Sequence, residues 1–132
     1  MERFEVLDKA GVFKSDDERI EYIDNELGEL EGQKNHALEG IAYIEFLKIR
    51  LEVLKSRKEH KMNNAANEQE REDINMSFSG DIRVAEDKIN NKEFYEAKVA
   101  QVESRMVYLN GVKTGIKLRM QTQNDNPVLG DN

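Results

Sequence analysis

Apolar residues recur every three or four positions along much of the chain, which is the spacing of one face of an α-helix. The clearest run lies within residues 41–54 and consists of Ile41, Ile44, Leu47, Leu51 and Leu54. An earlier run with the same spacing consists of Ile20, Ile23, Leu27 and Leu30. The pattern therefore predicts a long first helix that buries one stripe and leaves the rest in solvent.

The start of this helix is marked by the sequence Ser15-Asp16-Asp17-Glu18. A Ser followed three residues later by Glu is a capping box, in which each side chain bonds a free backbone N–H of the first turn. We therefore expect the helix to begin at residues 15–16. Gly28, Gly32 and Gly40 each cost about 1 kcal/mol against Ala in a helix interior, and we expect a hinge near Gly32.

The next stretch, residues 55–73, is poor in apolar side chains, and it predicts a continued but weakly packed helix. The sequence Met-Ser-Phe-Ser-Gly-Asp at 76–81 has turn and cap chemistry, so we expect the chain to reverse there. A second long helix is predicted from about 82 to 122. Its seam is Tyr95, Val99, Val102, Met106, Leu109, Ile116 and Met120, with Lys113 as the one charged member.

Together these elements predict an all-α fold, a long antiparallel helical hairpin of coiled-coil type with an N-terminal helical arm. Residues 1–36 form an apolar segment and an acidic arm, residues 37–124 the hairpin, and residues 125–132 a flexible tail. The composition agrees, because 36% of the 132 residues are charged and only 38% are hydrophobic. Such a balance suits long amphipathic helices better than a compact α/β domain.

The expected turn also sets an expected register, in which residues 41–54 lie opposite residues 105–118. Residues 1–36 then have no partner within the chain, although they carry an apolar stripe. We therefore expect a homo-oligomer, because a lone hairpin buries only one face of each helix. The residues expected at an oligomer or partner interface are Phe4, Val12, Phe13, Ile20, Ile23, Leu27, Leu30, Phe46 and Ile49.

Charge is unevenly distributed along a chain whose formal net charge is −7. Residues 48–61 hold six Lys/Arg and two Glu, and the expected register brings the basic residues of 98–120 to the same region. Such a zone could neutralise the phosphates of a nucleic acid. The candidate residues are Lys48, Arg50, Lys55, Arg57, Lys58, Lys61, Lys98, Arg105, Lys117 and Arg119. The alternative is a solvated helix face with pairs such as Lys48–Glu52.

Signs of catalysis are sparse. The chain has no cysteine, two isolated histidines, and neither a phosphate-binding loop nor a Ser/His/Asp set. The acid pair Glu26-x-x-Glu29 resembles the Mg²⁺ ligands of all-α nucleotide pyrophosphatases, with a second pair to come from Glu70 and Asp73 or from Glu86 and Asp87. We rank that enzyme a distant third and expect a protein without catalysis, cofactor or metal.

The N-terminus lacks the pattern of a secretory signal, and no run approaches the roughly 18 apolar residues of a membrane span. We expect a cytoplasmic protein without membrane contact, in the host cytoplasm if the chain is phage-encoded.

The order of these segments resembles a known group of proteins. A basic helix end (LKIRLEVLKSRKEHK) is followed by a polar acidic stretch (NEQEREDINMSFSGD) and a second helix (EFYEAKVAQVESRMVYLNGVKTGIKLRM). Over roughly residues 41–122 this layout is similar to the small helical phage recombination mediators, the UvsY-like group. The resemblance implies an oligomeric, non-enzymatic protein that binds single-stranded DNA and helps to load a recombinase against a single-strand-binding protein. The residues that would match the DNA-contacting role are Lys48, Arg50, Lys55, Arg57, Lys58 and Lys61.

Two functions of different class follow. The first is a DNA recombination or replication accessory protein that binds single strands and partner proteins through the basic zone. The second is a coiled-coil structural, adaptor or chaperone-like protein whose partner is another protein.

Overall fold

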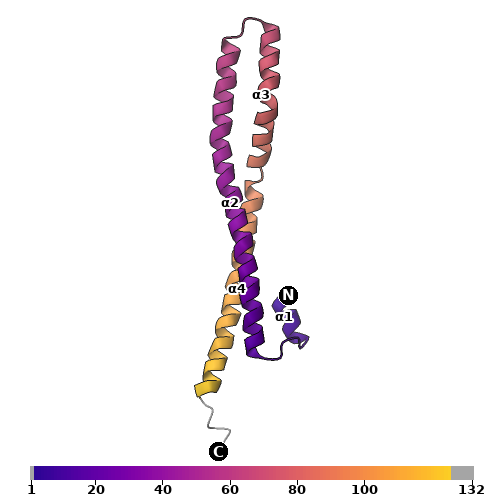
Figure 1. Ribbon diagram of the computed structural model, residues 1–132, viewed down its shortest axis with the longest axis vertical. Helices are drawn as coiled ribbons and strands as arrows, with labels where there is room; N and C mark the ends of the chain where they lie inside the picture. Colours follow the sequence, from indigo (N-terminus) through magenta and orange to yellow (C-terminus); the bar gives the residue numbers. More distant parts are fainter. Residues whose placement is uncertain (1, 126–132) are drawn as a thin grey trace, which may run out of the picture. The chain divides into compact units, whose positions relative to one another are not determined.

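The computed structural model describes residues 2–125 and contains four helices in that range (Figure 1). These are α1 (Arg3–Lys9), α2 (Asp16–Asn63), α3 (Glu68–Ile89) and α4 (Lys92–Asp125). The prediction of an all-α fold built on an antiparallel helical hairpin is confirmed. The expected tail, residues 125–132, begins at the last residue of α4 and otherwise lies outside the described residues.

The helices form two compact units. One, here called the terminal unit, joins residues 2–34 with residues 100–125. The other, here called the hairpin unit, consists of residues 35–99. Both α2 and α4 contribute residues to each unit, and the two units are described separately below.

The predicted start of the first helix is confirmed. Helix α2 begins at Asp16, and the Ser15 hydroxyl accepts a hydrogen bond of 3.2 Å from the Glu18 N–H. The Glu18 carboxylate in turn accepts from the Lys14 N–H, one residue before the Ser15 N–H that a capping box pairs. The hinge expected near Gly32 is wrong, because α2 runs unbroken through that residue to Asn63. Burial of its apolar stripe outweighs the low helix propensity of glycine.

The chain reverses at residues 64–67, where a cap with the same hydrogen bonds as that of α2 starts α3. The Asn67 side chain accepts from the Glu70 N–H at 2.8 Å, and the Glu70 carboxylate accepts from the Ala66 N–H at 2.9 Å. On the other side of the turn, the Asn64 side-chain amide donates to the His60 carbonyl at 2.8 Å. The expected continuation of one helix through residues 55–73 is therefore wrong.

The turn expected at residues 76–81 is also wrong, because this segment lies inside α3. Its serines fit a helix, since the Ser77 hydroxyl donates to the Ile74 carbonyl and the Ser79 hydroxyl donates to the Met76 carbonyl. The second long helix, expected from 82 to 122 without interruption, is instead divided at Asn90 and Asn91 into α3 and α4.

The terminal unit has a three-helix core. Its buried cluster consists of Phe4, Ile23, Leu30, Val102, Leu109 and Ile116. Phe4 of α1 stacks on Phe13 at a centroid distance of 5.4 Å, and Phe13 packs against Tyr22 at 5.3 Å. The expectation that residues 1–36 have no partner within the chain is therefore wrong, because α1 and the first half of α2 pack against α4.

The loop after α1 needs a glycine. Gly11 has φ +77°, a left-handed conformation that side chains with a Cβ rarely adopt. The Gly11 N–H donates to the Asp8 carbonyl at 3.0 Å, and the Val12 N–H donates to the Leu7 carbonyl at 3.1 Å. This is a Schellman turn, which ends α1 and directs the chain back toward α2.

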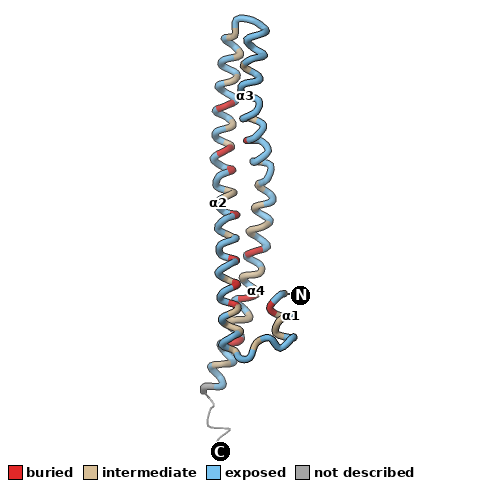
Figure 2. The backbone as a smooth tube through the Cα atoms, turned by 45° about the vertical axis from the view of Figure 1, so that its right-hand side comes forward, coloured by how far each residue is buried: buried red, intermediate tan, exposed pale blue. Residues whose placement is uncertain are grey.

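The hairpin unit has a narrower core, formed by one side of α2 and α3 (Figure 2). Its buried apolar residues are Ala37, Ile44, Leu47, Leu54 and Ala85. At Gly40 an added Cβ would lie 2.9 Å from the Tyr95 ring, so the missing side chain allows α2 and α4 to come close. In α4, which contributes to both units, every predicted seam residue from Tyr95 to Met120 is buried or half-buried, as the period of the pattern predicted.

Candidate interaction surfaces

The earlier reversal changes which charges face one another in the hairpin unit. Residues 48–61 lie against α3, and the Lys55 ammonium is 3.5 Å from the Glu86 carboxylate. The Lys61 ammonium lies 5.4 Å from the centroid of the Phe78 ring. The expected register, which placed residues 98–111 opposite residues 48–61, is wrong because it started from the wrong turn.

Residues 48–61 and α3 carry net charges of opposite sign. This stretch carries six Lys/Arg against two Glu, a net charge of +4. Helix α3 carries seven Asp/Glu against three Lys/Arg, a net charge of −4. A basic stretch of α2 thus lies beside an acidic helix, and Lys55 has its counter-charge on that helix.

Lys48 and Lys98 also belong to the hairpin unit. The Lys48 ammonium is 3.2 Å from the Glu45 carboxylate, which also lies 2.9 Å from Lys92. Hydrogen bonding to Lys92, and then to Lys48, lowers the pKa of Glu45. Lys98 is half-buried, and Arg50, Arg57 and Lys58 have no ion pair within the described range.

The remaining basic candidates, Arg105, Lys117 and Arg119, lie in the terminal unit. The structure thus does not place them in the same unit as residues 48–61. The Arg105 guanidinium pairs with Glu26, which is 8% exposed, and lies 3.5 Å from Glu2. Arg119 pairs with Asp16 and, by hydrogen bonding, lowers the pKa of that carboxyl below its ordinary value.

Six residues of the expected partner interface pack within the chain. Phe4, Ile23 and Leu30 are buried in the terminal unit's own core, and Phe13, Ile20 and Leu27 are partly buried against it. The expectation that these residues lack a partner within the chain is wrong, and the reason is again the register, which left them unpaired. Val12, Phe46 and Ile49 remain exposed.

A row of exposed apolar side chains follows one face of α2 in the hairpin unit. Phe46 is 55% exposed, Ile49 67% and Val53 42%, and Ala42 is exposed on the same face. At 100° per residue these four side chains lie about opposite to the buried Ile44. We call the face defined by Ala42, Phe46, Ile49 and Val53 the outer face of α2. Arg50 and Arg57 border it and line a shallow groove beside Phe46, Ile49 and Val53.

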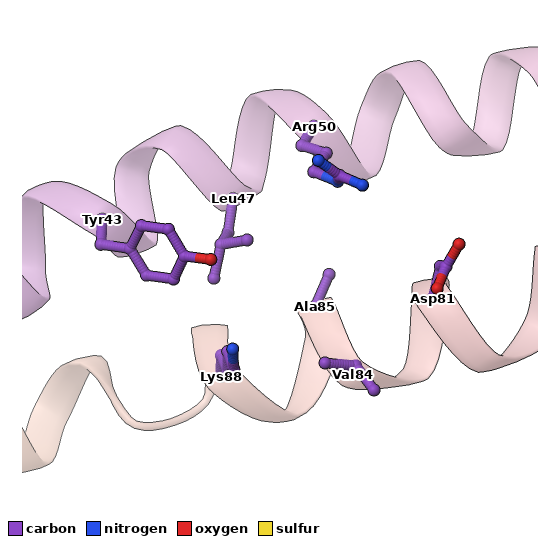
Figure 3. A pocket seen from close by; sticks show the side chains of 7 residues that line it. All are labelled: Tyr43, Leu47, Arg50, Asp81, Val84, Ala85 and Lys88. Atoms are coloured by element: carbon purple, nitrogen blue, oxygen red, sulfur yellow. The ribbon is translucent and has the colours of Figure 1, made fainter.

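A second hollow lies between α2 and α3 (Figure 3). Leu47 points from α2 toward Ala85 of α3, and the small alanine leaves space between the helices. The Lys88 ammonium lies 5.5 Å from the centroid of the Tyr43 ring at one end, and Arg50 and Asp81 lie at the other. The hollow is open and mixed in polarity, and it offers no set of converging polar groups of the kind that fixes a small ligand.

The acid pair considered for metal binding lies in the terminal unit. Glu26 is ion-paired with Arg105, so its charge is already compensated. In residues 2–125, no cluster of three or more Asp, Glu or His side chains is placed to hold a metal ion. None of the helices in this range combines the length and apolarity needed to cross a bilayer.

The outer face was only partly visible in the sequence, where Phe46 and Ile49 stood out as lying off the expected seam. The angular position of each residue on the helix would have placed Val53 on the same face. No protein-family model, curated protein or solved structure matches the chain.

Proposed function

We propose that this chain is a non-enzymatic adaptor or assembly protein that binds a helix of another protein chain through the outer face of α2. The observation that carries the proposal is the exposure of Phe46, Ile49 and Val53 on one helix face. Contiguous exposed apolar side chains bordered by charges are typical of protein-binding surfaces.

A helix is the partner element that fits this face. An amphipathic helix can present anchors at the same three- and four-residue spacing as Ala42, Phe46, Ile49 and Val53. Burial of apolar area contributes about 25 cal/mol per Å², so one Phe and two aliphatic side chains supply a usable but modest driving force.

The proposal is tested by site-specific photo-crosslinking in the cell that makes the protein. A photoreactive residue replaces Ile49, and a control places it at Val107, which is 73% exposed on α4 in the terminal unit. We expect position 49, but not position 107, to give a protein adduct of defined mass, identified by sequencing the attached peptide. The added substitution Val53→Glu should remove it. Adducts of equal yield at both positions, or none at position 49, contradict the proposal.

A second candidate is binding of single-stranded DNA in recombination or replication, together with a recombinase or single-strand-binding protein. The observation that favours it is that Arg50 lies near the exposed rings of Tyr43 and Phe46 and that Arg57 lines the same groove as Phe46. Neither arginine has an acidic partner among the described residues. Stacking on aromatic rings beside cationic side chains is a common mode of single-strand binding.

This candidate is tested by titrating a fluorescent oligonucleotide across a salt series. If it is correct, the slope of log K against log salt is about −0.7 per phosphate contacted, and Arg57→Glu makes it shallower. The matched control is Lys9→Glu, the same charge change at an exposed site in α1. Absence of binding at low salt, or equal effects of the two substitutions, excludes the candidate.

A further inference from the structure

We infer that the helix covering the outer face of α2 is the same segment of a second copy of this chain, packed parallel and in register. This inference rests on the proposed protein-binding function and names its partner. It is carried by the order of apolar and charged residues around the outer face.

The outer face has the spacing of a coiled-coil seam. Ala42, Phe46, Ile49, Val53 and Ser56 follow one another at intervals of four, three, four and three residues. All five are exposed, and this alternation is that of the a and d positions of a heptad. The outer face therefore forms a second seam on α2, separate from the seam that faces α3.

Acidic and basic residues occupy opposite borders of this second seam. Glu45, Glu52 and Glu59 recur every seven residues on one border, at the g positions. Arg50 and Arg57 recur every seven residues on the other border, at the e positions. The borders of a coiled-coil seam decide partner and orientation, because their side chains meet across the interface.

Only one symmetric arrangement brings these charges together favourably. In a parallel, in-register pair, a g residue meets the e residue five positions later in the other copy. Glu45 then faces Arg50 of the second copy, and Glu52 faces Arg57 of the second copy. In an antiparallel pair, g meets g and e meets e, so Glu would face Glu and Arg would face Arg. Like charges opposite one another disfavour that arrangement.

The pair formed by Glu52 and Arg57 is the more informative of the two. The Glu45 carboxylate already contacts Lys92 and Lys48 within its own chain. Glu52 and Arg57 are exposed and have no ion pair in the part of the chain that the structure describes. Substitutions at these two positions therefore change the proposed interface and leave the hairpin's own ion pairs intact.

The seam is short. Toward the N-terminus the equivalent positions hold Glu39, Asn35 and Gly32, and toward the C-terminus they hold His60 and Asn63. About two heptads remain, fewer than a stable isolated coiled coil needs. We therefore expect a dimer in reversible equilibrium with the monomer, not a permanent one.

Orientation is tested first, by cysteine crosslinking of the full chain, which has no cysteine of its own. Ala42→Cys and Ser56→Cys are prepared as separate single variants. In the parallel arrangement each variant alone forms a disulfide-linked dimer on oxidation, since residue 42 meets residue 42 and residue 56 meets residue 56. In an antiparallel arrangement centred near residue 49, only the mixture of the two variants crosslinks. That second result overturns the inference.

The charge pairs are tested by sedimentation equilibrium of the purified protein. Glu52→Arg alone or Arg57→Glu alone should each raise the dimer dissociation constant about tenfold, because two attractive pairs become repulsive. An equimolar mixture of the two variants should recover dimers close to the wild-type affinity, which a merely structural defect would not allow. Ile49→Glu should abolish the dimer with helicity unchanged, and the control Val107→Glu should leave it intact.

These outcomes separate the inference from the proposed function. If the purified chain is monomeric at every concentration while position 49 still crosslinks to a different protein in cells, the second copy is excluded and the adaptor function stands. If position 49 crosslinks to no protein and the chain is monomeric, both proposals fall.

Discussion

Two phenylalanines show how differently the two units of this chain are completed. Phe4 in the terminal unit is 5% exposed, whereas Phe46 in the hairpin unit is 55% exposed. The difference is the third helix. In the terminal unit α1 packs against both α2 and α4, but the middle of α2 in the hairpin unit has a helix of its own chain on one side only.

Two packed helices bury only one stripe of each helix. The remaining surface must therefore be polar or must be covered by another helix or another chain. The terminal unit meets this requirement with a short N-terminal helix. The hairpin unit leaves Phe46, Ile49 and Val53 in solvent. An apolar face without a partner in the chain is thus the property that distinguishes the second unit from the first.

The largest difference in stability is expected between two variants, each of which replaces one of these phenylalanines by alanine. Phe4→Ala leaves a cavity under α1 and should lower the free energy of unfolding of the terminal unit by about 3–5 kcal/mol. Phe46→Ala, measured at a concentration where the chain is monomeric, should change the free energy of unfolding of the hairpin unit by less than about 0.5 kcal/mol. Amide hydrogen exchange monitors both. Similar losses for the two variants would contradict the contrast between the units.

A second test compares a buried ion pair with an exposed one. Arg105→Ala removes the partner of the buried Glu26 carboxylate and should cost about 2 kcal/mol, because a charge is left without compensation. Lys55→Ala removes an exposed pair and should cost less than about 0.5 kcal/mol. Chemical denaturation measures both. If Glu26→Gln fails to recover part of the Arg105→Ala loss, the uncompensated charge is not the cause.

A third test uses two glycines of α2, one in each unit. Gly28 has open space around it, so Gly28→Ala should raise stability by about 0.5–1 kcal/mol through helix propensity. Gly40→Ala should gain less or lose stability, because its Cβ would lie 2.9 Å from the Tyr95 ring. Melting temperatures decide the order. In a Tyr95→Ala background the two substitutions should become equal, and a persistent gap would point to another cause.

The smallest effect should be the acid dependence of the terminal unit. Its Asp16 carboxyl has a pKa lowered mainly by the hydrogen bond from Arg119. The folded chain therefore gains stability from this group above the ordinary Asp pKa of about 3.9, and loses it as the pH falls below that value. Asp16→Asn should flatten the decline in melting temperature below about pH 4. An unchanged pH profile would show that Asp16 contributes no such term.

The helical class and the inner faces could be predicted from the sequence because a three- and four-residue spacing has one simple meaning. The register could not be predicted from that spacing alone. Two apolar seams with heptad-like spacing can be aligned with each other in several registers. The turn chemistry of residues 76–81 favoured a wrong register. Ser77, Ser79 and Gly80 are all tolerated inside α3, where the hydroxyls bond to backbone carbonyls.

Two signals in the sequence favoured the correct register. Asn67-x-x-Glu70 has the same capping pattern as Ser15-x-x-Glu18, which marked the start of α2 correctly. In addition, the expected register set residues 48–61 against another basic segment, whereas the observed one sets them against the acidic α3. Alignment of opposite charges would have rejected the wrong turn, and with it the assignment of Phe4 and Ile23 to a partner interface.

The position of the turn at residues 64–67 has a consequence for the order of folding. Contacts in the hairpin unit, such as that between Lys61 and Phe78, close short loops, whereas Tyr108 and Glu5 are 103 residues apart in sequence. Short loops cost less entropy to close, so we expect the chain to nucleate at Asn67 and to zip outward, with α1 docking last. In stopped-flow experiments, Asn67→Ala should then slow folding, and Phe4→Ala should instead accelerate unfolding. Helix α1 and the part of α4 that it contacts would thus be the last to pack together and the first to separate.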